Sequence, residues 1–117
     1  MSGNTTQFTI LSGYRLMWMM ALFDLPVDDS QRRRAATDFR NELLDMGFQM
    51  TQFSVYMKHL TGKEQAESLT RRIASAVPEY GDVKILCFTD KQYENLVSFR
   101  GRKRDTAPQN PGQLALF

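Results

Sequence analysis

Asp24 is a carboxylate placed where metal chemistry could occur. It directly follows the unbroken apolar run of residues 16–23, and Leu25 and Pro26 come next. A carboxylate is a hard oxygen ligand suited to Mg²⁺ or Mn²⁺, which proteins commonly hold with one or two carboxylates, waters and substrate phosphates. Asp24 could instead end a strand or cap the turn before Pro26, and spacing alone favours that structural role. The sequence therefore makes Asp24 a candidate metal ligand and catalytic residue, and the structural role stays open as the alternative.

Basic side chains are the second group of residues whose type and spacing suggest a function. Three consecutive arginines begin at Arg32, in the first turns of an expected helix, where cations are unfavourable for the helix dipole. An external anion such as phosphate would explain them. Each single cation could equally be solvated surface charge, but the group favours nucleic acid, bound through phosphates without sequence readout. The candidate contacts are Arg32, Arg33, Arg34, Lys58, Arg71, Arg72, Arg100, Arg102, Lys103 and Arg104.

Composition limits what else the chain can be. Its 117 residues, 42% hydrophobic and 24% charged, are typical of one globular domain with a modest core. A single cysteine, Cys87, excludes an internal disulfide and a cysteine-rich metal site, and suits the cytoplasm. The apolar run is far shorter than the roughly 20 residues that span a bilayer, and it lacks signal-peptide features. We therefore expect a cytoplasmic protein without a membrane partner.

The apolar run that ends at Asp24 is expected to be a strand, because it is too short for a core helix and Pro26 stops it. Apolar residues at every position require cover on both faces of the sheet. The chain's own helices can cover one face. The other face needs a second layer, which predicts a homodimer packed sheet to sheet.

Two helices and two further strands follow. Asp28 with Gln31 resembles a capping box that opens a helix over about residues 29–46, with Asp28 and Asp29 as caps rather than ligands. A second box at residues 61–64 opens a helix that Pro78 ends. The apolar phase slips at Gln52, so residues 48–57 form one bulged strand or two short strands. Residues 82–89 form the last core strand.

This order predicts a ferredoxin-like βαββαβ fold, an α+β sandwich with both helices on one face of an antiparallel sheet. We expect a flexible arm at residues 1–13, the folded domain at residues 14–100, and a basic linker with a pairing segment at residues 101–117. Residues 96–99 and 114–117 are candidate edge strands that could pair with another subunit.

Several short motifs resemble one family, the small CRISPR-associated adaptation proteins of the Cas-two family. They are residues 22–26 (Leu-Phe-Asp-Leu-Pro), 32–34 (Arg-Arg-Arg), 47–48 (Gly-Phe) and 52–56 (Gln-Phe-Ser-Val-Tyr). The Phe-Asp-Leu-Pro form, with residues 14–17 before it, looks most like the type II members. The resemblance covers residues 14 to about 101.

The resemblance implies a ferredoxin-like homodimer that bridges CRISPR integrase dimers and binds the double-stranded DNA of the incoming spacer. It implies that Asp24 occupies the family's metal position. Some members are described as magnesium-dependent endonucleases acting on RNA or DNA, and in others the aspartate is dispensable. We therefore rank a DNA-holding bridge above a nuclease, with a toxin-like ribonuclease acting alone as the alternative.

The C-terminal residues 113–117 (Gln-Leu-Ala-Leu-Phe) support a separate hypothesis. They are similar to the short peptide by which bacterial replication and repair proteins dock on the sliding clamp. Leu114, Leu116 and Phe117 would be the contact residues. A strand that pairs with the integrase or the sister subunit explains the same alternation and is favoured over the clamp.

Overall fold

The computed structural model describes residues 16–104 of the chain. The main elements are β1 (Leu16–Asp24), α2 (Ser30–Asp45), β2 (Gln49–Gln52), β3 (Val55–His59), α3 (Lys63–Ala76) and β4 (Asp82–Thr89). They are followed by α4 (Asp90–Glu94), β5 (Phe99–Arg100) and β6 (Lys103–Arg104). None of the described helices has the length and apolar content to cross a membrane. The expected arm at residues 1–13 lies outside the described residues.

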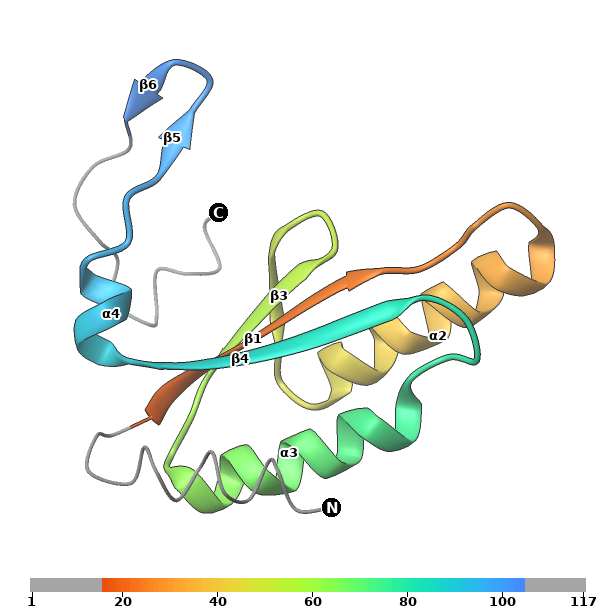
Figure 1. Cartoon of the computed structure of the whole chain (residues 1–117), viewed down its shortest axis with the longest axis horizontal. Coiled ribbons are helices and arrows are strands. Elements are labelled where there is room, and N and C mark those ends of the chain that lie inside the picture. Colours follow the sequence, from red (N-terminus) through yellow and green to blue (C-terminus); the bar gives the residue numbers. More distant parts are fainter. Residues whose placement is uncertain (1–15, 105–117) are drawn as a thin grey trace.

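Four strands form one sheet in the order β2-β3-β1-β4, and every neighbouring pair is antiparallel. Helices α2 and α3 lie side by side on one face of this sheet (Figure 1). The fold is therefore the ferredoxin-like α+β sandwich that the sequence predicted. Strand β1 is central, as its apolar run requires.

The core lies between this sheet and the two helices. From β1, Met19 and Ala21 are fully buried against Phe39 of α2 and Ile73 of α3. Phe23 continues the same row and meets the ring of Phe39 edge-on, with 5.2 Å between ring centroids. Alternate residues of β1 thus face the helices, which fixes the remaining side chains of the strand on the opposite face.

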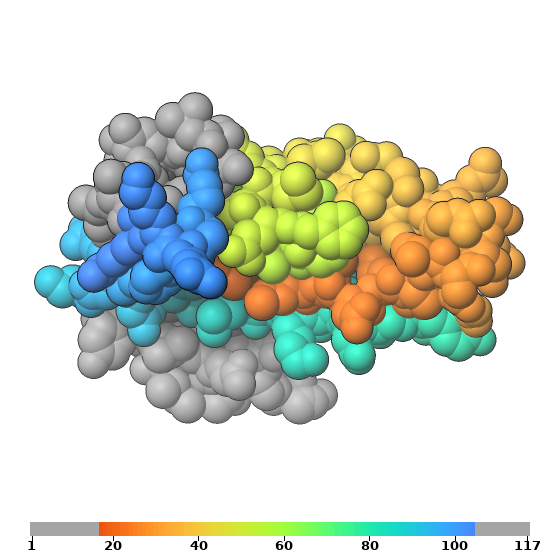
Figure 2. All heavy atoms as spheres, turned by 90° about the horizontal axis from the view of Figure 1, so that it is seen from above, coloured from red at the N-terminus to blue at the C-terminus, as the bar shows by residue number. Residues whose placement is uncertain are grey.

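The opposite face of the sheet is open over much of its area. Met20 and Leu22 of β1 are only partly buried there, and Leu86 of β4, the register partner of Met20, is 53% exposed. Figure 2 looks onto this side, where the β2–β3 turn and the β5–β6 hairpin rise in front of the sheet. An apolar sheet face that no element within residues 16–104 covers is a surface suited to a partner.

Both predicted helices are present, but their caps differ from the sequence prediction. Asp29, not Asp28, caps α2: its Oδ1 accepts a hydrogen bond of 2.8 Å from the backbone N–H of Arg32. Gly62 is the N-cap of α3 and makes no side-chain cap bond. Gln65, one residue after the expected partner Glu64, folds back to accept a bond from the Thr61 N–H at 2.7 Å. The helix starts were therefore correct to within two residues, and Asp29 is a cap as predicted, while the two predicted capping boxes were wrong.

The phase slip at Gln52 corresponds to a break between two strands. Strands β2 and β3 form a tight hairpin around Phe53 and Ser54, and the register of the pair shifts between Met50 and Gln52. Ser54, the second residue of the turn, has a positive φ of 64°, the conformation that a type II turn places at that position. Of the two open alternatives, the structure shows two short strands, with an irregularity near the turn.

The segment after β4 holds elements that the sequence analysis missed. The short helix α4 follows β4 directly, and β5 and β6 then pair with each other. Within this chain, residues 96–99 do not join the four-stranded sheet. Their pairing with another subunit stays a prediction, and residues 114–117 lie outside the described part.

Candidate functional site

Asp24 is the last residue of β1, and its side chain is exposed. It continues the row of Met20 and Leu22, so it lies on the open face of the sheet. Its register partner is Asp82, the first residue of β4. Directly opposed residues of antiparallel strands point to the same face, with Cβ atoms about 5 Å apart. Two carboxylates from one chain therefore lie side by side at the end of β1.

The backbone around Asp24 is held from both sides. The Phe23 N–H donates a hydrogen bond of 3.1 Å to the Ser54 carbonyl in the β2–β3 turn. On the other side, Gly81 has a φ of +111°, and a Cβ there would lie 2.9 Å from the Asp24 carbonyl oxygen. Only glycine combines that conformation with such a close approach. These contacts hold the backbone at the end of β1 in place and so position the carboxylate of Asp24.

The donor set at this end fits a hard divalent ion in part. Within residues 16–104, no group of three or more histidine, cysteine or acidic side chains is arranged to hold a metal. Asp24 and Asp82 are two oxygen donors. Magnesium is commonly bound by one or two carboxylates with waters and substrate phosphates completing the shell. The pair is compatible with such an ion only if other ligands come from solvent, substrate or a second chain.

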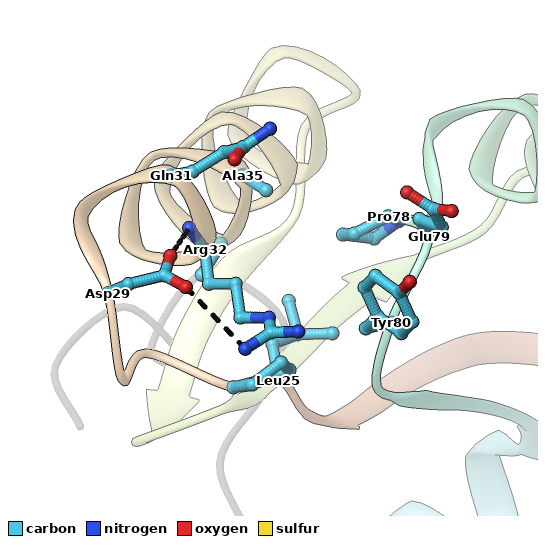
Figure 3. A pocket seen from close by; sticks show the side chains of 10 residues that line it. Leu25, Asp29, Gln31, Arg32, Ala35, Pro78, Glu79 and Tyr80 are labelled. Carbon is cyan, nitrogen blue, oxygen red and sulfur yellow. Dashed lines mark hydrogen bonds and ion pairs between the residues drawn. The ribbon is translucent and has the colours of Figure 1, made fainter.

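A pocket of about 320 Å³ lies beside this end, between the start of α2 and the connection from α3 to β4. Arg32 crosses it (Figure 3). Its Nη1 lies 3.1 Å from Asp28 and 3.5 Å from Asp29, and its guanidinium carbon lies 5.0 Å from the ring centre of Tyr80. Arg32 is therefore occupied by protein contacts that tie α2 to the α3–β4 connection.

The next two arginines are more available. Arg33 is exposed, and its Nη1 donates a bond of 3.3 Å to the Val27 carbonyl, which leaves its charge without an ion pair among residues 16–104. Arg34 is exposed, and the structure gives it no ion pair with another described residue. Of the three consecutive arginines, these two can reach a phosphate without breaking an ion pair.

The remaining basic residues lie elsewhere. Lys58 is on the helix side of β3, with its ammonium close to Gly47. Arg71 and Arg72 are exposed on α3, and Arg72 lies 3.8 Å from Glu42 of α2. These three cations are therefore on the helical side of the molecule and not on the open face that carries Asp24.

The cations of residues 100–104 sit at the other end of β1. Strand β1 pairs Asp24 with Asp82 at one end and Leu16 with Thr89 at the other, and the chain continues from Thr89 into α4. The nine residues of β1 span about 26 Å at the usual strand rise. We call residues 99–104, which form β5, β6 and their turn, the cationic hairpin. The structure thus separates this hairpin from Asp24.

Two residues near Asp24 had not been singled out from sequence. Asp82 was read only as the start of a strand, because its partner is set by register, which composition does not reveal. Tyr80 is 54% exposed, and its ring lies beside the guanidinium of Arg32. The candidate partner contacts Leu114, Leu116 and Phe117 lie outside the described residues.

Comparison with known proteins gives consistent matches. The family model described as CRISPR associated protein Cas2 matches residues 17–96. A protein of Paracidovorax avenae named CRISPR-associated endoribonuclease Cas2 is 54% identical over 108 residues, 92% of this chain and 100% of that protein. Proteins with the same name from Parvibaculum lavamentivorans and Flavobacterium psychrophilum are 43% and 39% identical, covering 86% and 94% of this chain and 100% and 96% of their own lengths.

Proposed function

The chain belongs to the CRISPR-associated Cas2 family, and we propose that it acts in spacer acquisition as a dimeric bridge that holds double-stranded DNA between integrase dimers. In this proposal Asp24 forms a conditional metal-dependent nuclease site and not the main function. The observation that supports this proposal most is the open apolar face of the sheet. A second copy of the chain could pack on this face, and Asp24 lies at its end.

The open face supports a homodimer. Leu86 is 53% exposed in the middle of β4, and Met20 and Leu22 beside it are only partly covered. A second copy packed sheet to sheet would remove these side chains from water, which is favourable in proportion to the apolar area buried. A two-fold axis near the end of β1 would also bring two copies of Asp24 to the same side of the dimer.

The arrangement of cations supports a duplex as the ligand. Arg33 and Arg34 lie beyond one end of β1, and the cationic hairpin lies beyond the other. The separation of at least about 26 Å corresponds to about eight base pairs along a helix that rises 3.4 Å per step. A ligand with regularly spaced phosphates can contact both groups, whereas a small ligand cannot.

Asp24, with Asp82 beside it, would hold Mg²⁺ or Mn²⁺ in the nuclease site. When bound, such an ion polarises a phosphodiester and lowers the pKa of a coordinated water. Arg33 and Arg34 would orient the substrate phosphates and stabilise charge that develops on them. This proposal assigns both carboxylates at the end of β1 to the ion and leaves neither as a separate general base, which supports a conditional role for cleavage.

An endoribonuclease that acts on its own is the second candidate. It is favoured by the name shared by the relatives, CRISPR-associated endoribonuclease. The two proposals differ in what Asp24 does. In the first, its carboxylate is dispensable for DNA binding and spacer integration, and in the second it is required for the only activity.

Purified protein separates the two candidates. Binding to a labelled DNA duplex is measured against salt concentration, and cleavage of RNA and DNA is measured with and without Mg²⁺, for the wild type and Asp24→Asn. The bridge predicts duplex binding with a steep salt dependence that Asp24→Asn retains. Efficient Mg²⁺-dependent RNA cleavage lost in Asp24→Asn, together with no duplex binding, would favour the independent ribonuclease.

A further inference from the structure

A carboxylate at the base of the cationic hairpin links three elements. Asp90 is the first residue of α4, and its Oδ1 accepts a hydrogen bond of 2.9 Å from Trp18 Nε1 of β1. The same oxygen lies 3.9 Å from Nε2 of His59 on β3. Trp18 is 1% exposed, so its indole N–H has to find a partner within the protein. Asp90 supplies that partner from α4.

Ring packing strengthens the same junction. Tyr93 of α4 stacks on Trp18 with 4.2 Å between ring centroids, and His59 meets Trp18 edge-on at 4.9 Å. Desolvation at this junction raises the pKa of Tyr93, which agrees with the close packing of its ring on the indole. A helix of five residues is not stable in isolation. These contacts with the sheet therefore determine where α4 sits.

The cationic hairpin follows α4 in the chain, so the position of α4 determines where the hairpin begins. The chain passes from α4 through residues 95–98 into β5, and Figure 1 shows β5 and β6 beyond α4, away from the four-stranded sheet. Each hairpin strand has two residues, and so small a hairpin has little stability of its own. Its cations are directed by whatever holds its base.

We propose that Asp90 is a positioning residue for nucleic-acid binding: by joining Trp18 and His59 to α4, it directs the cationic hairpin toward the duplex. This inference rests on the proposed function, because it takes the hairpin to be a duplex contact. Its consequence runs against simple electrostatics. Removing a negative charge normally strengthens binding to a polyanion, whereas removing this carboxylate weakens it.

The test compares two acidic residues of the same short helix. Glu94 is exposed at the end of α4, and the structure gives it no ion pair or hydrogen bond through its side chain with another described residue. Affinity for a fluorescein-labelled DNA duplex is measured by anisotropy for the wild type, Asp90→Ala, Asp90→Asn, Glu94→Ala and Glu94→Gln. A variant in which Arg102, Lys103 and Arg104 are alanine tests the hairpin itself.

Asp90→Ala is expected to bind the duplex about tenfold more weakly than the wild type, the loss of one charged hydrogen bond. Asp90→Asn keeps an oxygen acceptor for Trp18, so its duplex affinity is expected to lie between those of the wild type and Asp90→Ala. Both Glu94 variants bind as well as the wild type or more tightly. Trp18 is the chain's single tryptophan, so acrylamide quenching of its fluorescence reports directly whether α4 still covers it, and quenching increases in Asp90→Ala.

The outcomes separate the inference from the function on which it rests. Binding by Asp90→Ala that equals or exceeds that of the wild type, while the hairpin variant is weakened, overturns the positioning role alone. If the hairpin variant binds the duplex as tightly as the wild type does, both the positioning role of Asp90 and the role of the hairpin as a duplex contact are overturned. Should Asp90→Ala fail to fold, the pair Asp90→Asn and Glu94→Gln decides: equal affinities overturn the role, and weaker binding by Asp90→Asn supports it.

Discussion

Asp24 and Asp82 are direct cross-strand partners on the open face of the sheet, which sets two carboxylates side by side at the end of β1. Like charges in directly opposed positions of a sheet are destabilising. A cation bound between the strand ends would reverse that effect. The proposed ion site therefore predicts that a divalent ion stabilises the protein.

The substitution Asp82→Asn tests this link. Without divalent ions we expect it to stabilise the fold by about 0.5 kcal/mol, because it removes the repulsion from Asp24. With millimolar Mg²⁺ the wild type gains stability by ligand binding and the variant gains less. Thermal unfolding with and without Mg²⁺ measures both effects. Equal Mg²⁺ stabilisation of the two proteins would show that Asp82 is not part of an ion site.

The three consecutive arginines are predicted to divide into two roles. Arg32→Ala removes contacts to Asp28, Asp29 and Tyr80 and should lower the free energy of unfolding by about 1 kcal/mol. The double variant Arg33→Ala and Arg34→Ala should leave stability unchanged within about 0.5 kcal/mol. It should also make the plot of log duplex affinity against log salt concentration less steep, by the amount that corresponds to the loss of about two phosphate contacts.

Urea unfolding and salt-dependent duplex binding on the same preparations check this division. Arg32→Lys is the matched control, since it retains the positive charge but loses the planar fork. A double variant of Arg33 and Arg34 that binds duplex with the wild-type salt slope would contradict the assignment. So would an Arg32→Ala protein as stable as the wild type.

The open sheet face is predicted to be the dimer surface. Leu86→Glu places a charge at the middle of that face and should weaken the dimer by at least about tenfold, because the charge would be buried without a partner. Leu44→Glu is the control: Leu44 is similarly exposed, at 50% against 53% for Leu86, but lies on α2. Analytical ultracentrifugation over a dilution series measures both. Equal dimerisation of the two variants would rule this face out.

Cys87 is predicted to be a slow thiol. Burial raises the pKa of Cys87 from 9.0 to about 11. At pH 8 this makes its thiolate fraction about 100-fold smaller than that of an unperturbed thiol. Alkylation of the native protein should be slower by a similar factor and become normal in urea. Because the unfolded thiol ionises first, the stability contribution of this burial is lost as the pH rises above about 9.

The rate of iodoacetamide labelling, followed by mass spectrometry, tests the Cys87 prediction. A native protein labelled as fast as the urea-unfolded one at pH 8 would show that the thiol is not held in the desolvated position on the helix side of β4.

The sequence was sufficient for the main fold because its signals were local. The apolar run ending at Asp24 needed both faces covered, and periodic residues such as Phe39 and Ile73 defined the two helices, so strand and helix order followed. The predicted capping boxes were wrong because neighbouring residues, such as Asp28 and Asp29, carry the same chemistry. Only the backbone path into α2 decides which of them meets the free N–H groups.

The site was less accessible from sequence because it depends on register. Asp24 could be nominated from its place after a strand, but its partner Asp82 lies 58 positions later (82 − 24) and is set by antiparallel pairing. The Asp90 junction was missed for the same reason, since Trp18 and Asp90 are far apart in the chain. A basic segment read as a linker likewise proved to contain a hairpin.

Spacer integration in cells tests the central claim most directly, with the wild type compared with Asp24→Asn and with the double variant Arg33→Ala and Arg34→Ala. The account predicts that Asp24→Asn still acquires spacers and that the arginine variant does not, because the protein works by holding DNA. Loss of acquisition in Asp24→Asn, with its dimer and duplex binding intact, would contradict the account and make the metal site part of the mechanism.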